Sequence, residues 1–231
     1  MSAADISKAV AAVSLPLLWS SRVLPALSLD IRGRTAANAA FSTGYALVFQ
    51  GNPNWISSRG GRTGAAVAGV VLAGYGAALA VPAIRRHFAE LADRGPEVST
   101  AEWAGVHIPV GTVLSEELVY RATLTPLLEE SFGSRGSLLG ALTFGLSHIQ
   151  PARAAGDPVP ATVAVTTLAG LLFDRLYRRT ASATAPALLH LALNAGGALT
   201  PVAARRVATT TPRPAESPPR AAVADTPTRS H

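Results

Sequence analysis

Polar residues that could act on a peptide bond lie inside otherwise apolar stretches of the chain. An ionisable side chain at the centre of a membrane-spanning helix costs about 2.5 to 3.5 kcal/mol on scales derived from membrane-insertion experiments. Such residues therefore persist mainly where they form ion pairs or take part in function. The polar residues that stand out in this way are, in chain order, Glu116, Glu117, Arg121, His148, His190 and Asn194.

The first group lies in "VGTVLSEELVYRATLTPLLEE". Residues four apart share a helix face, so Glu117 and Arg121 are predicted to form an ion pair in the favoured order, with the acid on the N-terminal side. Glu116 lies about 100 degrees around the helix, on a different face and without a local cation. We expect Glu116 to point into a cavity, where a carboxylate is suited to take a proton from water.

The other two groups repeat the four-residue spacing. In "LTFGLSHIQP" the ring of Phe144 is expected one turn below His148, and in "LLHLALNAGG" His190 and Asn194 share a face. Peptide hydrolysis needs a base, a group or metal that holds the water, and donors for the oxyanion. A lone histidine in an apolar helix is more often a structural hydrogen-bond partner, but three helices with suitable polar sets favour a catalytic site.

The composition indicates whether water or lipid surrounds the helices that carry these residues. The chain has 231 residues, of which 48% are hydrophobic and only 15% are charged, so it is too apolar for an ordinary soluble domain. We therefore expect an all-α, polytopic transmembrane helical bundle of about seven helices, each near the roughly 20 residues that cross a bilayer. The apolar stretches are residues 10–29, 36–50, 63–82, 104–127, 136–150, 159–177 and 183–200.

Two features of these stretches bear on packing and processing. Lys8 precedes the first apolar run, which also fits a signal peptide, although a retained helix is favoured. Small residues recur every fourth position, which predicts close helix contacts, although an alanine-rich genome bias produces the same pattern. These small residues are Ala65, Gly69, Ala73, Ala77, Gly136 and Gly140.

The remaining charges indicate no further site. The net charge of +6 is scattered between apolar segments and the C-terminal end, so we expect a lipid bilayer as partner and no nucleic acid. Loop charges divide too evenly to assign an orientation. Solvated or interfacial roles are predicted for Glu129, Glu130, Arg135, Asp157, Asp174 and Arg175, and non-catalytic roles for His87 and His107.

Composition also divides the chain into two parts. Residues 1–204 are predicted to form the transmembrane domain, and residues 205–231, rich in Pro, Thr and Arg, a disordered tail. The chain has no cysteine, which excludes disulfides, a thiol nucleophile and cysteine zinc sites.

Three motifs carry a resemblance to a known family. "EELVYR", "FGLSH" and "HLALN" match the patterns EExxxR, FxxxH and HxxxN. In order and approximate separation they resemble the CAAX protease and bacteriocin-processing family, also called the Abi or type II CAAX prenyl endopeptidase family. The similarity covers residues 104–200. It implies an intramembrane endopeptidase that cleaves a membrane-associated peptide or protein. The arginine-heavy composition suggests a bacterial cell membrane.

The resemblance also implies roles for the residues. Glu116 would be the general base on the attacking water, and His148 would hold that water or share its proton. His190 and Asn194 would bind the oxyanion, while the supporting residues would be Glu117, Arg121 and Phe144. The family chemistry is either metal-dependent, with zinc on His148 and His190, or metal-free and glutamate-based, and the absence of HExxH does not decide between them.

Two readings from other classes remain open on the sequence. A non-catalytic immunity or scaffold protein could keep the same helical bundle and recognise a membrane partner. A small transporter could use buried carboxylates as proton relays, although the two halves of the chain show no inverted repeat. The complete polar set favours the protease.

Overall fold

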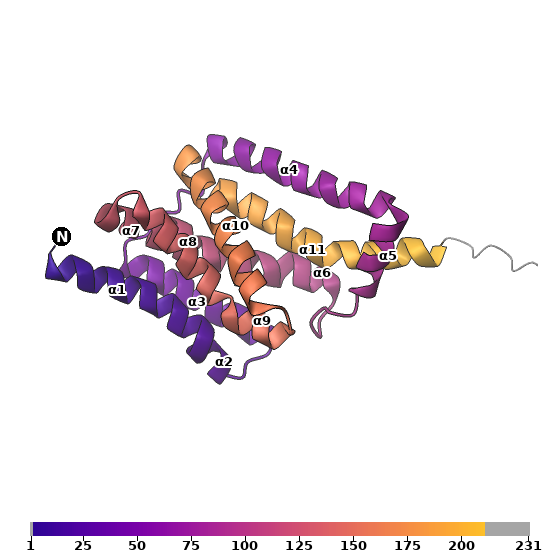
Figure 1. The fold of residues 1–231 in the computed structure, drawn as a ribbon, viewed down its shortest axis with the longest axis horizontal. Helices are drawn as coiled ribbons and strands as arrows, with labels where there is room; N and C mark the ends of the chain where they lie inside the picture. The colour runs from indigo at the N-terminus through magenta and orange to yellow at the C-terminus, as the bar shows by residue number, and fades with distance from the viewer. Residues whose placement is uncertain (1, 211–231) are drawn as a thin grey trace, which may run out of the picture.

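A computed structural model describes residues 2–210, and every regular element in that range is a helix (Figure 1). The elements are α1 (Ala3–Leu18), η1 (Trp19–Val23), α2 (Leu24–Ala26), α3 (Ile31–Val48), α4 (Ser58–Ala80), α5 (Pro82–Glu90), α6 (Thr100–Glu102), η2 (Trp103–Leu114), η3 (Glu117–Leu124), α7 (Thr125–Phe132), α8 (Arg135–Ser147), α9 (Ile149–Ala155), α10 (Val159–Thr180) and α11 (Thr184–Thr210). The predicted all-α class is therefore confirmed.

Four helices in the described part of the chain are long and apolar enough to cross a membrane. They cover Ala3–Ala26, Ser58–Ala80, Val159–Thr180 and Thr184–Val207. Large apolar side chains such as Val70 and Leu168 remain 73% and 66% exposed, as expected where lipid rather than protein covers the helix.

Local signals in the sequence begin and end these helices. The Asp30 carboxylate accepts from the Gly33 N–H at 2.7 Å and caps α3, and the Ser57 hydroxyl caps α4 through the Gly60 N–H at 3.0 Å. Gly156, with φ of 73°, ends α9 in the left-handed region. α11 continues to Thr210, into the segment predicted as a tail, while the rest of that segment, 211–231, lies outside the described residues.

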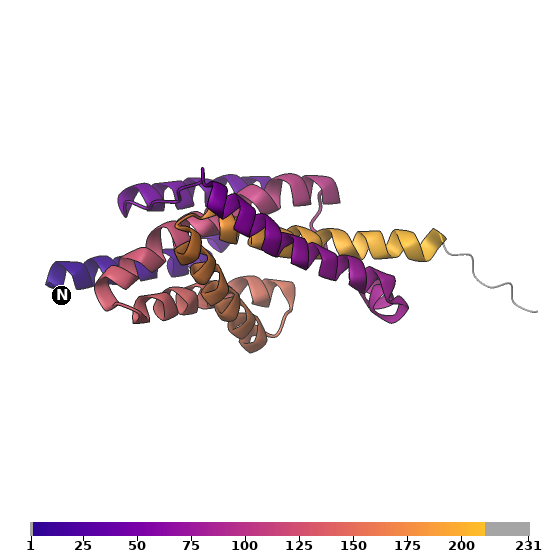
Figure 2. The same cartoon turned by 90° about the horizontal axis from the view of Figure 1, so that it is seen from above.

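The helices pack around α11 and α8. α11 lies along α4, as Figures 1 and 2 both show, and also contacts η2 and α10. α8 packs between α7 and α10, and α3 packs on η2 and η3. These contacts bring the three motif-bearing segments, from η3, α8 and α11, together in one core with Phe144, Phe173 and Leu189.

Wide helical turns occupy the segments around the two glutamates. η2 and η3 are π-helical, with bonds from i to i+5, a rare geometry that is frequent at functional sites. Pro109 inside η2 lacks the N–H that an α-helix would use there. The α-helical spacing assumed from the sequence therefore does not hold over Trp103–Leu124, and side-chain directions there differ from the expected ones.

The predicted stripe of small residues is confirmed on α8 but not on α4. Ala65, Gly69 and Ala73 of α4 are exposed, and nothing in the described structure lies within 4 Å of a Cβ built on Gly69. α4 instead packs through Gly64, where a Cβ would come within 2.9 Å of Ala185 on α11. The hydrophobic pattern of α4 could not show which of its faces meets protein.

Gly136 at the start of α8 is predicted to tolerate no side chain. A Cβ there would overlap the backbone of Leu128 and Glu129 in α7, so Gly136→Ala should separate the two helices and destabilise the fold by about 1–3 kcal/mol. Thermal unfolding in detergent measures the effect. Gly69→Ala is the matched control, because it adds the same methyl group to open space; equal melting temperatures for both variants would contradict the packing described here.

Candidate active site

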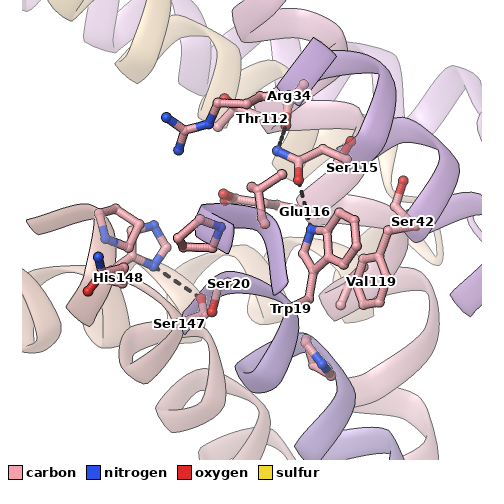
Figure 3. A pocket seen from close by; sticks show the side chains of 18 of the residues that line it. Trp19, Ser20, Arg34, Ser42, Thr112, Ser115, Glu116, Val119, Ser147 and His148 are labelled. Carbon is pink, nitrogen blue, oxygen red and sulfur yellow. Dashed lines mark hydrogen bonds between the residues drawn. The ribbon is translucent and has the colours of Figure 1, made fainter. Parts of the chain in front are cut away.

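A cavity of about 550 Å³ lies between the N-terminal helices and the three motif-bearing segments. Its walls come from α1 to α3, η2, η3, α8, α9 and α11. Glu116, His148 and Asn194 all line it, and Figure 3 shows Glu116, His148 and Trp19 around the same space. Three of the four predicted catalytic residues, far apart in sequence, thus share one cavity.

His190 lies between the two glutamates. Its Nδ1 donates to Glu117 Oε1 at 2.9 Å, and its Nε2 lies 3.6 Å from Glu116 Oε2. Glu116 was expected on a different face from Glu117 and without a local cation, and the structure brings both carboxylates to opposite edges of one imidazole from another helix. The wide turn that begins at Glu117 changes the angular spacing on which that expectation depended.

Glu116 retains an unused acceptor. Its side chain is 26% exposed, but Oε2 is shielded from solvent and has no hydrogen-bond partner among residues 2–210. Buried polar atoms are normally satisfied, and an exception calls for a water, an ion or a catalytic role. Glu116 lines the cavity and part of its side chain is exposed there, so its carboxylate is a candidate site for a bound water molecule.

The orientation of His148 is fixed by its own helix. Its Nδ1 lies 2.7 Å from the Phe144 carbonyl oxygen, which can only accept, so Nδ1 carries a proton. The Phe144 ring packs edge-on at 4.7 Å between centroids, as the four-residue spacing predicted. With Nδ1 occupied, Nε2 is the ring nitrogen left for a ligand in the cavity.

Asn194 and the ring of His190 are held by their surroundings. Asn194 Nδ2 donates to the His190 carbonyl at 3.1 Å, one turn earlier in α11, and the amide lines the cavity. The His190 imidazole is 4% exposed and stacks on Phe173 with 4.9 Å between centroids. The predicted common face of His190 and Asn194 is therefore present.

Arg121 is a buried cation behind the cavity wall. Its Nε lies 3.7 Å from Glu117 Oε2, as the spacing predicted, and 3.6 Å from Asp174 Oδ1. The guanidinium also lies over the Phe144 ring at 4.2 Å. None of its nitrogens has a hydrogen-bond partner within the described chain. Two carboxylates and an aromatic face thus compensate its charge.

Asp174 corrects a prediction. A solvated or interfacial role was expected for it because it lies near the end of an apolar stretch, but it is 2% exposed. It accepts from Thr125 at 3.2 Å and from Ser137 at 3.5 Å, and it faces Arg121. The signal was present in the sequence: an acid inside residues 159–177 is as costly in lipid as Glu117.

A second polar network fastens α3 to the start of η2. Glu102 accepts from Arg32 Nε at 2.7 Å and lies 3.2 Å from His107 Nε2, whose Nδ1 lies 2.8 Å from the Thr35 hydroxyl. Two hydrogen bonds hold the pKa of the Glu102 carboxyl below its ordinary value. The one from Arg32 has the larger effect and the one from His107 the smaller. His107 therefore has a structural position, in line with its predicted non-catalytic role.

The side chains do not form a zinc site as they are placed. Among residues 2–210 no three His, Asp or Glu side chains come close enough together to hold a metal ion. His190, one of the two predicted ligands, has Nδ1 bonded to Glu117 and Nε2 facing Glu116.

These observations define a class of protein. Apolar helices long enough to span a bilayer surround a cavity that contains a carboxylate, an imidazole and an amide. The family model of the type II CAAX prenyl endopeptidases, described as Rce1-like, matches residues 99–196. The match includes all three motifs and agrees with the resemblance predicted from them; it covers less than half of the chain.

The match also bears on location and activity. A membrane protease family and four apolar helices together indicate an integral membrane protein with peptide substrates. No curated protein and no solved structure matches the chain.

Proposed function

We propose that the protein is an intramembrane endopeptidase that hydrolyses a peptide bond of a membrane-associated peptide or protein with a water activated by Glu116. The main support is the partly exposed carboxylate of Glu116 in the cavity that His148 and Asn194 also line. No other carboxylate lines this cavity in the described structure. The substrate is not assumed to be prenylated.

Glu116 acts as the general base. It takes a proton from the bound water while the water oxygen attacks the carbonyl carbon of the substrate, and the carbonyl oxygen becomes an oxyanion. His148 Nε2 accepts a hydrogen bond from the same water and orients it, a role that fits the proton held on Nδ1 by Phe144. Glu116 then returns its proton to the departing amine nitrogen as the C–N bond breaks.

His190 and Asn194 stabilise the oxyanion. The role of His190 requires a proton on Nε2, the ring nitrogen that lies 3.6 Å from Glu116 Oε2. Glu117 accepts from Nδ1 and so keeps the ring in place. Asn194 uses one amide hydrogen on the His190 carbonyl and retains the second for the substrate. Donors fixed in this way need no reorganisation during the reaction.

Arg121 supports the site from behind. It neutralises part of the charge of Glu117 and Asp174, so Glu117 remains an acceptor for His190 although it is fully buried. Phe144 separates Arg121 from His148, because its ring contacts both side chains. In this proposal neither Arg121 nor Phe144 touches the substrate.

Removal of metal is predicted to leave the activity unchanged, because the proposed steps use only side chains. Purified protein in lipid vesicles should cleave apolar membrane peptides at the same rate before and after treatment with a strong zinc chelator, and elemental analysis should find less than one zinc per chain. Products are identified by mass spectrometry. Loss of cleavage on chelation, with recovery on adding zinc, would overturn the metal-free mechanism.

A further inference from the structure

We propose that Asp174 is a positioning residue of the active site. It shares the guanidinium of Arg121 with Glu117 and so keeps Glu117 in place as the acceptor for His190. The inference rests on the proposed function, which uses Glu117 and Arg121 but gives Asp174 no role of its own. Asp174 acts through these side chains and does not touch the substrate.

Asp174 is a buried acid that three helices hold in place. It lies in α10 and is 2% exposed, and a carboxylate so buried needs hydrogen-bond partners and a cation. The Thr125 hydroxyl of α7 donates to Oδ1 at 3.2 Å, and the Ser137 hydroxyl of α8 donates to Oδ2 at 3.5 Å. The cation that it faces is Arg121. Because α7, α8 and α10 all hold this carboxylate, it gives Arg121 a counter-charge at a fixed position.

Arg121 lies midway between two acids. Its Nε is 3.6 Å from Asp174 Oδ1 and 3.7 Å from Glu117 Oε2, and both distances are longer than a direct hydrogen bond. The guanidinium also lies over the rings of Phe144 at 4.2 Å and Phe173 at 4.8 Å. Aromatic faces attract a cation but offer it no carboxylate oxygen. The nearly equal distances indicate that the attraction of one acid balances that of the other.

This balance fixes the side chain that orients His190. Glu117 Oε1 accepts from His190 Nδ1 at 2.9 Å, while its Oε2 faces Arg121. Without the charge of Asp174, the guanidinium would be drawn to Glu117 alone, and the Glu117 carboxylate would turn with it. The imidazole would then move relative to the cavity, and a misplacement of about 1 Å in an active site can cost about 10²-fold in rate.

α10 contacts this network through two consecutive residues. The Phe173 ring stacks on the His190 imidazole with 4.9 Å between centroids, and Asp174 faces Arg121. One turn of α10 therefore supports the imidazole directly through a ring and indirectly through a carboxylate. Asp174 thus lies next to the residue on which the imidazole packs.

Asp174→Asn tests the inference, because asparagine keeps the size of the side chain and an acceptor for Thr125 but removes the charge. The full-length protein is held in lipid vesicles, and kcat and KM are measured with an apolar membrane peptide. We expect kcat to fall about tenfold, the effect of a displacement of less than about 1 Å. KM should remain that of the wild type, because Asp174 is not among the described residues that line the catalytic cavity.

Asp157→Asn is the matched control. Asp157 pairs with Arg94 at 3.1 Å, but its side chain is 43% exposed. The same chemical change outside the buried network should therefore leave both kcat and KM unchanged.

A spectroscopic signal reports the position of His190 without turnover. In protein labelled with ¹⁵N-histidine, the hydrogen bond from Nδ1 to a buried carboxylate should place the Nδ1–H proton at unusually low field, and its absence from the His190→Gln protein assigns it. We expect Asp174→Asn to shift this signal and Asp157→Asn to leave it in place. Thr125→Val keeps the charge of Asp174 but removes one of its hydroxyl donors, so it should shift the signal by a smaller amount and lower kcat less.

The outcomes separate positioning from stability alone. Wild-type kcat and an unshifted signal in folded Asp174→Asn protein would overturn the inference, even if the yield of that protein fell. If Asp174→Asn does not fold, Thr125→Val decides, and a wild-type kcat and signal for that variant would also overturn it. A wild-type protein that shows the signal but cleaves no peptide would count against the proposed function instead, because the signal is measured without substrate.

Discussion

Glu116→Gln is expected to abolish peptide cleavage while the protein remains folded. Glutamine keeps the shape of the side chain but cannot take a proton from water, and a positioned general base contributes about 10²- to 10⁴-fold to the rate. The change in kcat is measured on a membrane peptide in lipid vesicles. The thermal unfolding temperature should remain that of the wild type, because Glu116 Oε2 makes no hydrogen bond within the described structure that the amide would lose.

The control for this experiment is Glu130→Gln. Glu130 is exposed and lies outside the cavity, so the same chemical change should leave kcat unaffected. A Glu116→Gln protein with full activity would remove the general base from the mechanism. That result would favour a non-catalytic binding protein with the same fold.

Arg121→Ala is expected to damage the fold rather than the chemistry alone. The change leaves Glu117 and Asp174 buried without a cation, and breaking a buried ion pair in this way costs about 3–5 kcal/mol. It also removes the guanidinium from the Phe144 ring. We expect low abundance in the membrane and early aggregation on heating, measured by size-exclusion chromatography in detergent.

Arg178→Ala is the matched control, because it breaks an ion pair that is exposed rather than buried. Arg178 pairs with Glu129 at 2.7 Å, but its side chain is 43% exposed, and exposed pairs contribute at most about 1 kcal/mol. The two variants should therefore differ clearly in yield and melting temperature. Normal expression and stability of Arg121→Ala would show that its charge is not needed to compensate the two acids.

The sequence predicted which polar residues lie together better than it predicted their detailed geometry. The free-energy cost of placing polar side chains in lipid drew attention to Glu116, His148 and Asn194. The structure places these three residues around one cavity. The four-residue spacing of Phe144 and His148 also held, because α8 is a regular α-helix there. The position of Glu116 relative to His190 could not be predicted, because it depends on the π-helical turns of η2 and η3.

Other misses came from contacts between distant segments. Asp174 was expected in a solvated or membrane-interface position because it lies near the end of a predicted helix. The sequence could not show that Arg121, from a distant segment, lies beside it. The stripe at Ala65, Gly69 and Ala73 has the period of a packing face, yet it is the side of α4 that no described helix covers. Apolar periodicity gives the faces of a helix but does not tell protein from lipid, since both are apolar.

The most direct test of the account is an experimental structure in a lipid environment, at a resolution that shows ordered water. We predict one water molecule within hydrogen-bond distance of both the Glu116 carboxylate and His148 Nε2, with His190 and Asn194 at the edge of the same space. A dry or lipid-filled cavity, or a Glu116 side chain directed away from His148, would contradict the proposed peptidase.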